Sequence, residues 1–129
     1  MSVFFYDFLR GTMMRNREGK HLKTVSEVCG ELGITRKTLF YYDRIGLLVP
    51  AERIGPQSHK MYSETEISRL KEILKYRHAG LSISEISRIL GQDSSIRKEV
   101  LLGVLERMMK QKKEMETNIL SVRGLLESI

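Results

Sequence analysis

The feature that most constrains this sequence is its last quarter. Residues 95–128 contain no proline and only two glycines, which predicts one continuous helix of about 34 residues that spans roughly 50 Å. Apolar residues recur along it at alternating steps of four and three, the heptad pattern of a coiled coil. These apolar positions are Leu101, Leu105, Met108, Met115, Ile119, Val122 and Leu126, with one polar interruption at Lys112.

A heptad seam of this length needs a partner helix. The other residues of a 129-residue chain offer no second helix long enough to cover it, so we expect pairing with another copy to give a homodimer. The alternative is that the helix packs on the N-terminal part of its own chain. Lys112 either sets the register or orientation of the pair or extends its ammonium group out of the seam.

The composition argues against several classes of protein. The single cysteine, Cys29, cannot form an internal disulfide or a multi-thiolate zinc site, and it favours the cytoplasm. No apolar run approaches the ~20 residues of a membrane-spanning helix, so we expect no membrane partner. The three histidines are scattered, so no metal or other cofactor is predicted. Without a phosphate loop, a nucleophile motif or paired carboxylates, we do not expect an enzyme.

Positive charge is concentrated in one third of the chain. The net charge is +6, and residues 20–62 carry seven Lys or Arg residues against four Asp or Glu residues. Half of the net charge therefore lies in this segment. This distribution favours a polyanion such as nucleic acid as the partner of residues 20–62.

The same basic segment contains the signals of two short helices joined by a tight turn. Ser26 is the predicted N-cap of the first helix and Gly33 its end, with Cys29 on the buried apolar side or, alternatively, acting as a thiol switch. Thr35 is the predicted N-cap of the second helix, which Gly46 closes. Two helices joined this closely are typical of a helix-turn-helix.

Further elements follow in an order typical of a small DNA-binding domain. Residues 53–61 place glycine, proline and serine between segments that can extend, which predicts a hairpin or wing. Ser63 and Glu66 match a capping box that opens a helix. That helix is expected to end at Gly80, and a further short helix is expected to end at Gly91.

One run of residues resembles a known family signature. Residues 38–50 read T-L-F-Y-Y-D-R-I-G-L-L-V-P, which is similar to the signature of the MerR family of bacterial transcriptional regulators. The order of parts also agrees: a helix-turn-helix, a hairpin that ends in Lys60-Met61-Tyr62-Ser63, the segment 73–80 and a long terminal helix. The resemblance extends over residues 22–129.

The resemblance implies an α-dominated fold in which a winged helix-turn-helix domain with a small β wing precedes an antiparallel coiled-coil dimerisation helix. We assign residues 21–92 to the DNA-binding domain and residues 93–129 to the dimerisation helix. Residues 1–20 form an N-terminal extension, and the part before Met14 is either untranslated or packs its aromatic side chains on the body.

The resemblance also implies a function. Proteins of this family bind a pseudo-palindromic operator in double-stranded promoter DNA as homodimers. They bend and untwist the DNA so that RNA polymerase can use both promoter elements. The sequence identifies no small-molecule effector. Two other functions are compatible with the residues: an architectural protein that bends DNA without controlling a promoter, and a coiled-coil interaction protein whose helix-turn-helix no longer binds DNA.

The resemblance assigns DNA contacts by position to Thr35, Arg36, Lys37, Thr38, Tyr41, Tyr42, Lys60 and Arg77. Arg36 is the candidate for a guanine edge and Lys37 for a phosphate. The resemblance places both tyrosine hydroxyls near phosphates; the alternative is that one of the two rings lies in the core, and helical spacing predicts that Tyr42 is the more buried. The family usually has a basic residue where this chain has Phe40, so one polar contact is lost or is replaced by an apolar contact to a thymine methyl group. His59 and Lys60 similarly replace the Tyr-Arg pair of the family wing.

Overall fold

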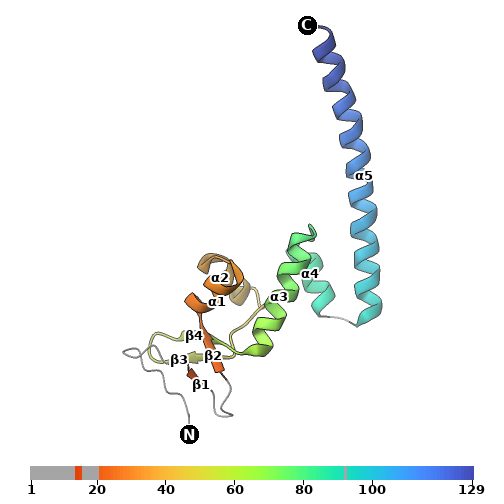
Figure 1. Ribbon diagram of the computed structural model, residues 1–129. Coiled ribbons are helices and arrows are strands. Elements are labelled where there is room, and N and C mark those ends of the chain that lie inside the picture. The colour runs from red at the N-terminus through yellow and green to blue at the C-terminus, as the bar shows by residue number, and fades with distance from the viewer. Residues whose placement is uncertain (1–13, 16–20, 92) are drawn as a thin grey trace. The chain divides into compact units, whose positions relative to one another are not determined.

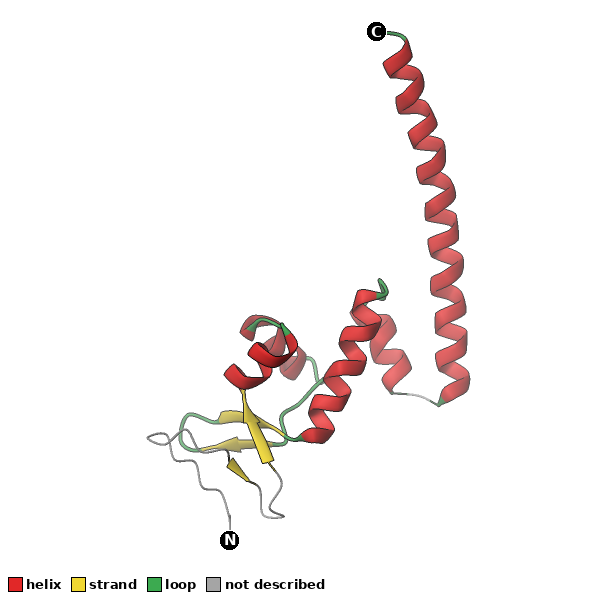
Figure 2. Ribbon diagram, in the orientation of Figure 1, coloured by secondary structure: helices red, strands yellow, loops and turns green. Residues whose placement is uncertain are grey.

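The computed structural model of the chain describes residues 14–15, 21–91 and 93–129 (Figure 1). The chain divides into two compact units, and the boundary between them along the sequence lies between Tyr76 and Arg77. Its elements are β1 (Met14–Arg15), β2 (His21–Thr24), α1 (Val25–Leu32), α2 (Arg36–Arg44), β3 (Glu52–Ile54), β4 (His59–Tyr62), α3 (Glu64–His78), α4 (Ile83–Leu90) and α5 (Ser94–Glu127). The predicted fold class, mostly helical with a small β wing, is confirmed (Figure 2).

The strands of the first unit form one antiparallel sheet in the order β1-β2-β4-β3. β3 and β4 are the predicted hairpin, in which Arg53 lies opposite Lys60. The Ser58 N–H donates to the Gly55 carbonyl at 3.0 Å, which is the hydrogen bond between the first and fourth residues of a β-turn. These two residues adopt positive φ, 51° for Ser58 and 76° for Gly55. β2 was not predicted; it pairs with β4, with Lys23 opposite Tyr62. We call β3, β4 and their turn the wing.

The capping residues fix where the first two helices begin and end. Thr24, and not the predicted Ser26, is the N-cap of α1, because it forms a capping box with Glu27 directly where β2 ends. Gly33 ends α1 in the left-handed conformation with φ of 68°, as predicted. Thr35 caps α2 as predicted, and the last helical residue of α2, Arg44, precedes Gly46, the predicted stop, by two residues.

The core of the first unit draws on all of its larger elements. Its buried side chains are Leu22, Val25, Val28, Ile34, Leu39, Tyr42, Leu47, Leu48, Met61, Tyr62, Ile67, Leu70, Ile73 and Tyr76. Leu22 from β2 and Met61 from β4 pack together, with Ile54 against them. Cys29 of α1 is only partly buried, which is less than the full burial that we expected for this side chain.

The second unit is a helical hairpin of α4 and α5 that follows the end of α3. Ser82 and Glu85 form the capping box of α4, and Asp93 caps α5. Glu85 also accepts a hydrogen bond from the Arg107 guanidinium at 2.6 Å, so one carboxylate supports both helices. The buried side chains of this unit are Leu81, Ile86, Ile89, Val100 and Val104. Among the described residues, no helix is long and apolar enough to cross a membrane.

Candidate nucleic-acid interface

The helix α2 has one buried and one exposed side. Leu39 and Tyr42 are buried, at 0% and 4% exposure, and they hold the helix on the core of the first unit. The opposite side carries most of the residues predicted to contact DNA. Arg36, Lys37 and Tyr41 are exposed, together with Thr35 at the N-cap, while Thr38 is half-buried.

The first turn of α2 is fixed by its own threonines. The Thr35 hydroxyl accepts a hydrogen bond from the Thr38 N–H at 3.1 Å, and the two hydroxyl oxygens lie 2.8 Å apart. This cap satisfies a backbone donor that the helix itself leaves free. Thr35 and Thr38 are therefore used to start the helix, and the side chains that project beside them are Arg36 and Lys37.

The two cations of the first turn differ in how they are held. The Arg36 guanidinium donates to the Ser26 hydroxyl of α1 at 2.8 Å, so the hydroxyl that we predicted as a cap instead orients an arginine. Lys37 makes no hydrogen bond or ion pair with any residue that the structure describes. Arg36 thus has a partner that directs its side chain, whereas Lys37 has none among the described residues, a difference that suits base and phosphate contacts respectively.

Tyr41 and Tyr42 lie on different sides of the helix. Their ring centroids are 6.2 Å apart and the planes are tilted by 49°. Tyr42 is buried while Tyr41 is 39% exposed, which confirms that Tyr42 is the more buried ring. The guanidinium of Arg44 lies over the Tyr41 ring, 5.4 Å from its centroid. Tyr41 is accordingly the tyrosine with a ring open to a partner.

An acidic residue of α2 anchors the wing. The carboxylate of Asp43 accepts two hydrogen bonds from Arg53, at 2.8 and 2.6 Å, and the Lys60 ammonium lies 3.6 Å from it. The hydrogen bonds from Arg53, followed by the positive charge of Lys60, hold the pKa of Asp43 below its usual value. Our sequence reasoning missed this anchor, although Asp43 stands out as an acid within the basic segment.

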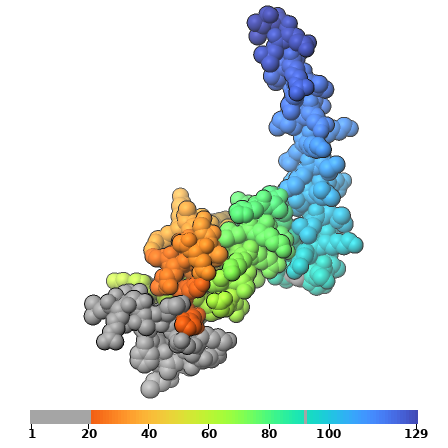
Figure 3. Space-filling model, viewed as in Figure 1, coloured from red at the N-terminus to blue at the C-terminus, as the bar shows by residue number. Residues whose placement is uncertain are grey.

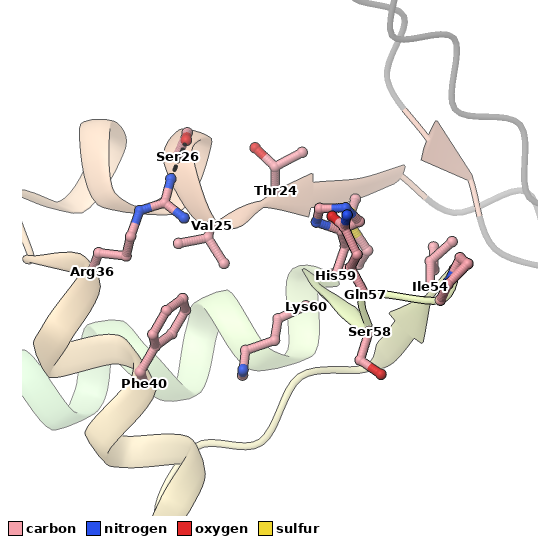
Figure 4. A pocket seen from close by; sticks show the side chains of 13 residues that line it. Thr24, Val25, Ser26, Arg36, Phe40, Ile54, Gln57, Ser58, His59 and Lys60 are labelled. Atoms are coloured by element: carbon pink, nitrogen blue, oxygen red, sulfur yellow. Dashed lines mark hydrogen bonds between the residues drawn. The ribbon is translucent and has the colours of Figure 1, made fainter.

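A groove separates the helix-turn-helix from the wing. It encloses about 700 Å³, and its walls are the start of α1, the residues Arg36 and Phe40 of α2, and residues 54–61 of the wing. Figure 4 shows Arg36, Phe40 and Lys60 directed toward the same space, with the Arg36–Ser26 hydrogen bond at its upper edge. The groove thereby brings together three positions that we singled out in the sequence, two on α2 and one, Lys60, on the wing.

Arg77 belongs to the second unit. It is exposed near the end of α3, and its guanidinium donates to the Leu81 carbonyl at 2.8 Å. This hydrogen bond closes the turn between α3 and α4. The side chain thus has a structural partner within its own unit, and its predicted contact to a phosphate stays a prediction.

The heptad positions of α5 are open in the single chain. Six of the seven apolar seam residues are exposed, from Leu101 at 37% to Leu126 at 64%; the seventh, Met108, is half-buried and reaches Gly80. In the space-filling view the C-terminal half of α5, drawn in blue, extends beyond the other residues of its own unit (Figure 3). A stripe of apolar side chains this long is an unpartnered surface of the chain.

The fold and the candidate site together define the structural class of the protein. A helix-turn-helix whose second helix exposes cations, followed by a two-stranded wing pinned to that helix, is a winged helix-turn-helix protein. Residues 23–93 match the family model described as "MerR HTH family regulatory protein". The chain belongs to the MerR family, as its signature predicted.

Relatives and solved structures agree with this assignment. The transcriptional activator TipA of Streptomyces coelicolor is 43% identical over 67 residues, which cover 52% of this chain and 26% of TipA. The transcriptional activator mta of Bacillus subtilis is 31% identical over 108 residues, 84% of this chain and 40% of mta. The crystal structure of the N-terminus of Mta superposes with a TM-score of 0.71 and 30% identity, covering 81% of this chain and 97% of that one.

The chain thus spans about a quarter of the length of TipA and two-fifths of the length of mta. These relatives are named as transcriptional activators and not as enzymes, as expected for this family.

Proposed function

We propose that the chain is a transcriptional regulator that binds double-stranded promoter DNA through α2 and the wing. The observation that carries the proposal is the arrangement of α2: its capped first turn presents Arg36 to the groove that Lys60 of the wing also lines, and it leaves Lys37 exposed to solvent. A helix of this kind enters the major groove with its N-terminal residues toward the base edges. Membership in a family of helix-turn-helix regulators supports the same reading.

Each contact residue has a role that follows from its chemistry. The oriented guanidinium of Arg36 matches the two acceptors of a guanine edge. Lys37, Lys60 and the Tyr41 hydroxyl suit phosphates, which demand charge or a donor but no fixed geometry. Arg77 of the second unit is assigned to a further phosphate, with its hydrogen bond to Leu81 holding it near the end of α3.

The proposed active form is a homodimer. The exposed seam of α5 supports it, because a second copy of the same helix would cover these side chains in an antiparallel coiled coil. Residues 21–92 then bind one half-site and residues 93–129 join the two copies. A two-fold dimer predicts a pseudo-palindromic operator.

The proposed mechanism is deformation of the operator. Bending a site of this size costs on the order of 1–6 kcal/mol, and phosphate contacts on the bent duplex offset that cost. Bending and untwisting would bring the two promoter elements into the alignment that RNA polymerase requires. This step deepens the DNA-binding proposal and is tested separately from it.

The test begins with selection of duplexes from a random pool by the full chain. Affinity for a selected duplex and for its scrambled version is then measured at several salt concentrations, with end-labelled duplexes reporting bending by energy transfer. Transcription in vitro with bacterial RNA polymerase follows on a promoter that carries the selected site. We expect selective binding that weakens steeply with salt, together with bending and a change in transcription. Absence of duplex binding would leave a coiled-coil interaction protein, and bending without a change in transcription would leave an architectural protein.

A further inference from the structure

Phe40 is an apolar ring on the polar side of α2. It follows Arg36 by four residues and precedes Asp43 by three, so the three side chains share one face of the helix. Phe40 lines the groove beside the wing, and 36% of the residue is exposed. Leu39 and Tyr42 are the residues that α2 buries in the core, so Phe40 lies outside the core.

Two cations from different elements hold the ring in place. The Lys60 ammonium of β4 lies 4.4 Å from the ring centroid, within the range of a cation–π interaction. The Arg36 guanidinium lies 6.0 Å from the same centroid, at the outer limit of that range. A basic side chain at this position would instead bring a third positive charge next to these two.

The cations on either side of Phe40 are themselves fixed. Lys60 is shared between the ring and the carboxylate of Asp43, and Arg36 is tied to Ser26 of α1. The ring therefore sits at a defined place between two groups that attract DNA. Its exposed part can offer a partner only apolar contact.

An exposed apolar ring between two cations suits an apolar group on the edge of a base pair. In the major groove the thymine 5-methyl is the apolar group among the base edges, and aromatic side chains contact it. One helical turn separates Arg36 from Phe40, a rise of roughly 6 Å, against about 3.4 Å between successive bases of a strand. We infer that Phe40 is a specificity-determining residue, whose ring contacts the 5-methyl group of a thymine one or two base steps from the base that Arg36 reads. This inference rests on the proposed DNA-binding function.

The test removes the methyl group and the ring separately. Duplexes are selected from a random pool by the wild-type chain, and each thymine of a selected half-site is replaced in turn by deoxyuridine, which differs only in lacking the methyl group. Affinities are measured by fluorescence anisotropy for the wild type, Phe40→Ala and Phe40→Leu. Tyr41→Phe is the matched control, since it alters the neighbouring residue and leaves Phe40 in place. Circular dichroism and thermal melting establish that each variant is folded.

We expect one thymine per half-site at which deoxyuridine weakens wild-type binding about fourfold, the effect of one buried methyl group. Phe40→Ala should bind the thymine and deoxyuridine duplexes equally, Phe40→Leu should retain part of the discrimination, and Tyr41→Phe should retain all of it. Discrimination that persists in folded Phe40→Ala, or enrichment of a duplex with no methyl-dependent position, overturns this inference alone. If the wild-type chain enriches no duplex, the proposed function fails and this inference falls with it.

Discussion

Arg36 and Lys37 are neighbours on the first turn of α2, yet only Arg36 has a partner that directs its side chain. We therefore expect Arg36→Ala to weaken binding to a selected duplex by roughly 1–3 kcal/mol and to leave binding to scrambled DNA almost unchanged. Lys37→Ala should weaken both about equally and lower the salt slope by about one. Anisotropy titrations at several salt concentrations measure both effects. Equal losses on both duplexes for Arg36→Ala would make Arg36 a backbone contact.

Asp43 gives the wing a dependence on pH. Its pKa is depressed chiefly by the hydrogen bonds from Arg53, so the pair stabilises the fold above the ordinary pKa of aspartate, about 4, and that contribution is lost as the pH falls through the depressed value. Asp43→Asn should lower the free energy of unfolding at pH 7 by roughly 1–3 kcal/mol, toward the lower end because Arg53 is exposed.

Urea unfolding of the wild type and Asp43→Asn at pH 7 and at successive steps down to pH 3 measures this difference. The gap between the two proteins should narrow as the pH falls below about 4. A gap that stays constant over this range would show that the Asp43 charge contributes nothing to stability.

The elements that local signals specify could be predicted from the sequence, and those that depend on distant partners could not. Thr35 and Gly33 act through hydrogen bonds within a few residues, so their roles were readable. β2 exists because it pairs with β4, almost forty residues later, and a four-residue strand leaves little periodicity to detect. The N-cap of α1, which we placed at Ser26, could have been predicted correctly from the sequence, because Thr24 and Glu27 have the spacing of a capping box.

For the candidate site too, the position of residues along one helix could be predicted from the sequence, and the contacts between distant elements could not. Family resemblance placed Arg36, Lys37 and Tyr41 on an exposed helix face, and the structure finds them there. The contacts that link α2 to the wing, from Asp43 to Arg53 and from Phe40 to Lys60, join residues at least ten positions apart. No single-sequence pattern reports such a pairing.

The seam of α5 belongs to the scale of the element, and we expect it to hold the dimer together. Met115→Asp combined with Ile119→Asp places two charges on the seam, and burying them would cost more than the interface gains. Sedimentation at micromolar concentration should then show monomers. Lys110→Asp with Thr117→Asp, on the far side of the same helix, is the control and should stay dimeric. A dimeric seam variant would place the interface elsewhere.

Lys112 interrupts the seam, and its effect on dimer stability can be tested separately from that of the apolar seam residues. A polar residue at a core position limits the stability of a coiled coil while restricting its geometry. Lys112→Leu adds one buried apolar side chain per copy, worth about 1.5 kcal/mol or more, so the dimer dissociation constant should fall at least tenfold. Dilution monitored by sedimentation or by subunit exchange measures it. An unchanged constant would mean that the lysine already lies outside the interface.

At the scale of the whole molecule we expect function without a transition metal. No group of three His, Cys, Asp or Glu residues that could hold an ion occurs in the parts of the chain that the structure describes. Protein purified without an affinity tag should contain well under one equivalent of zinc or copper per dimer by elemental analysis. DNA binding should survive a chelator. A stoichiometric metal whose removal abolishes binding would contradict this.

The carboxylate of Asp43 has a consequence for how quickly such a protein could find its operator. The carboxylate neutralises part of the positive charge of Arg53 and Lys60, and this weakens attraction to the phosphates of random sequence. Because a genome offers millions of such sites in competition with one target, briefer stays on each of them shorten the search. In the proposed complex, the group that secures the wing to α2 also limits the time that the regulator spends on the wrong DNA.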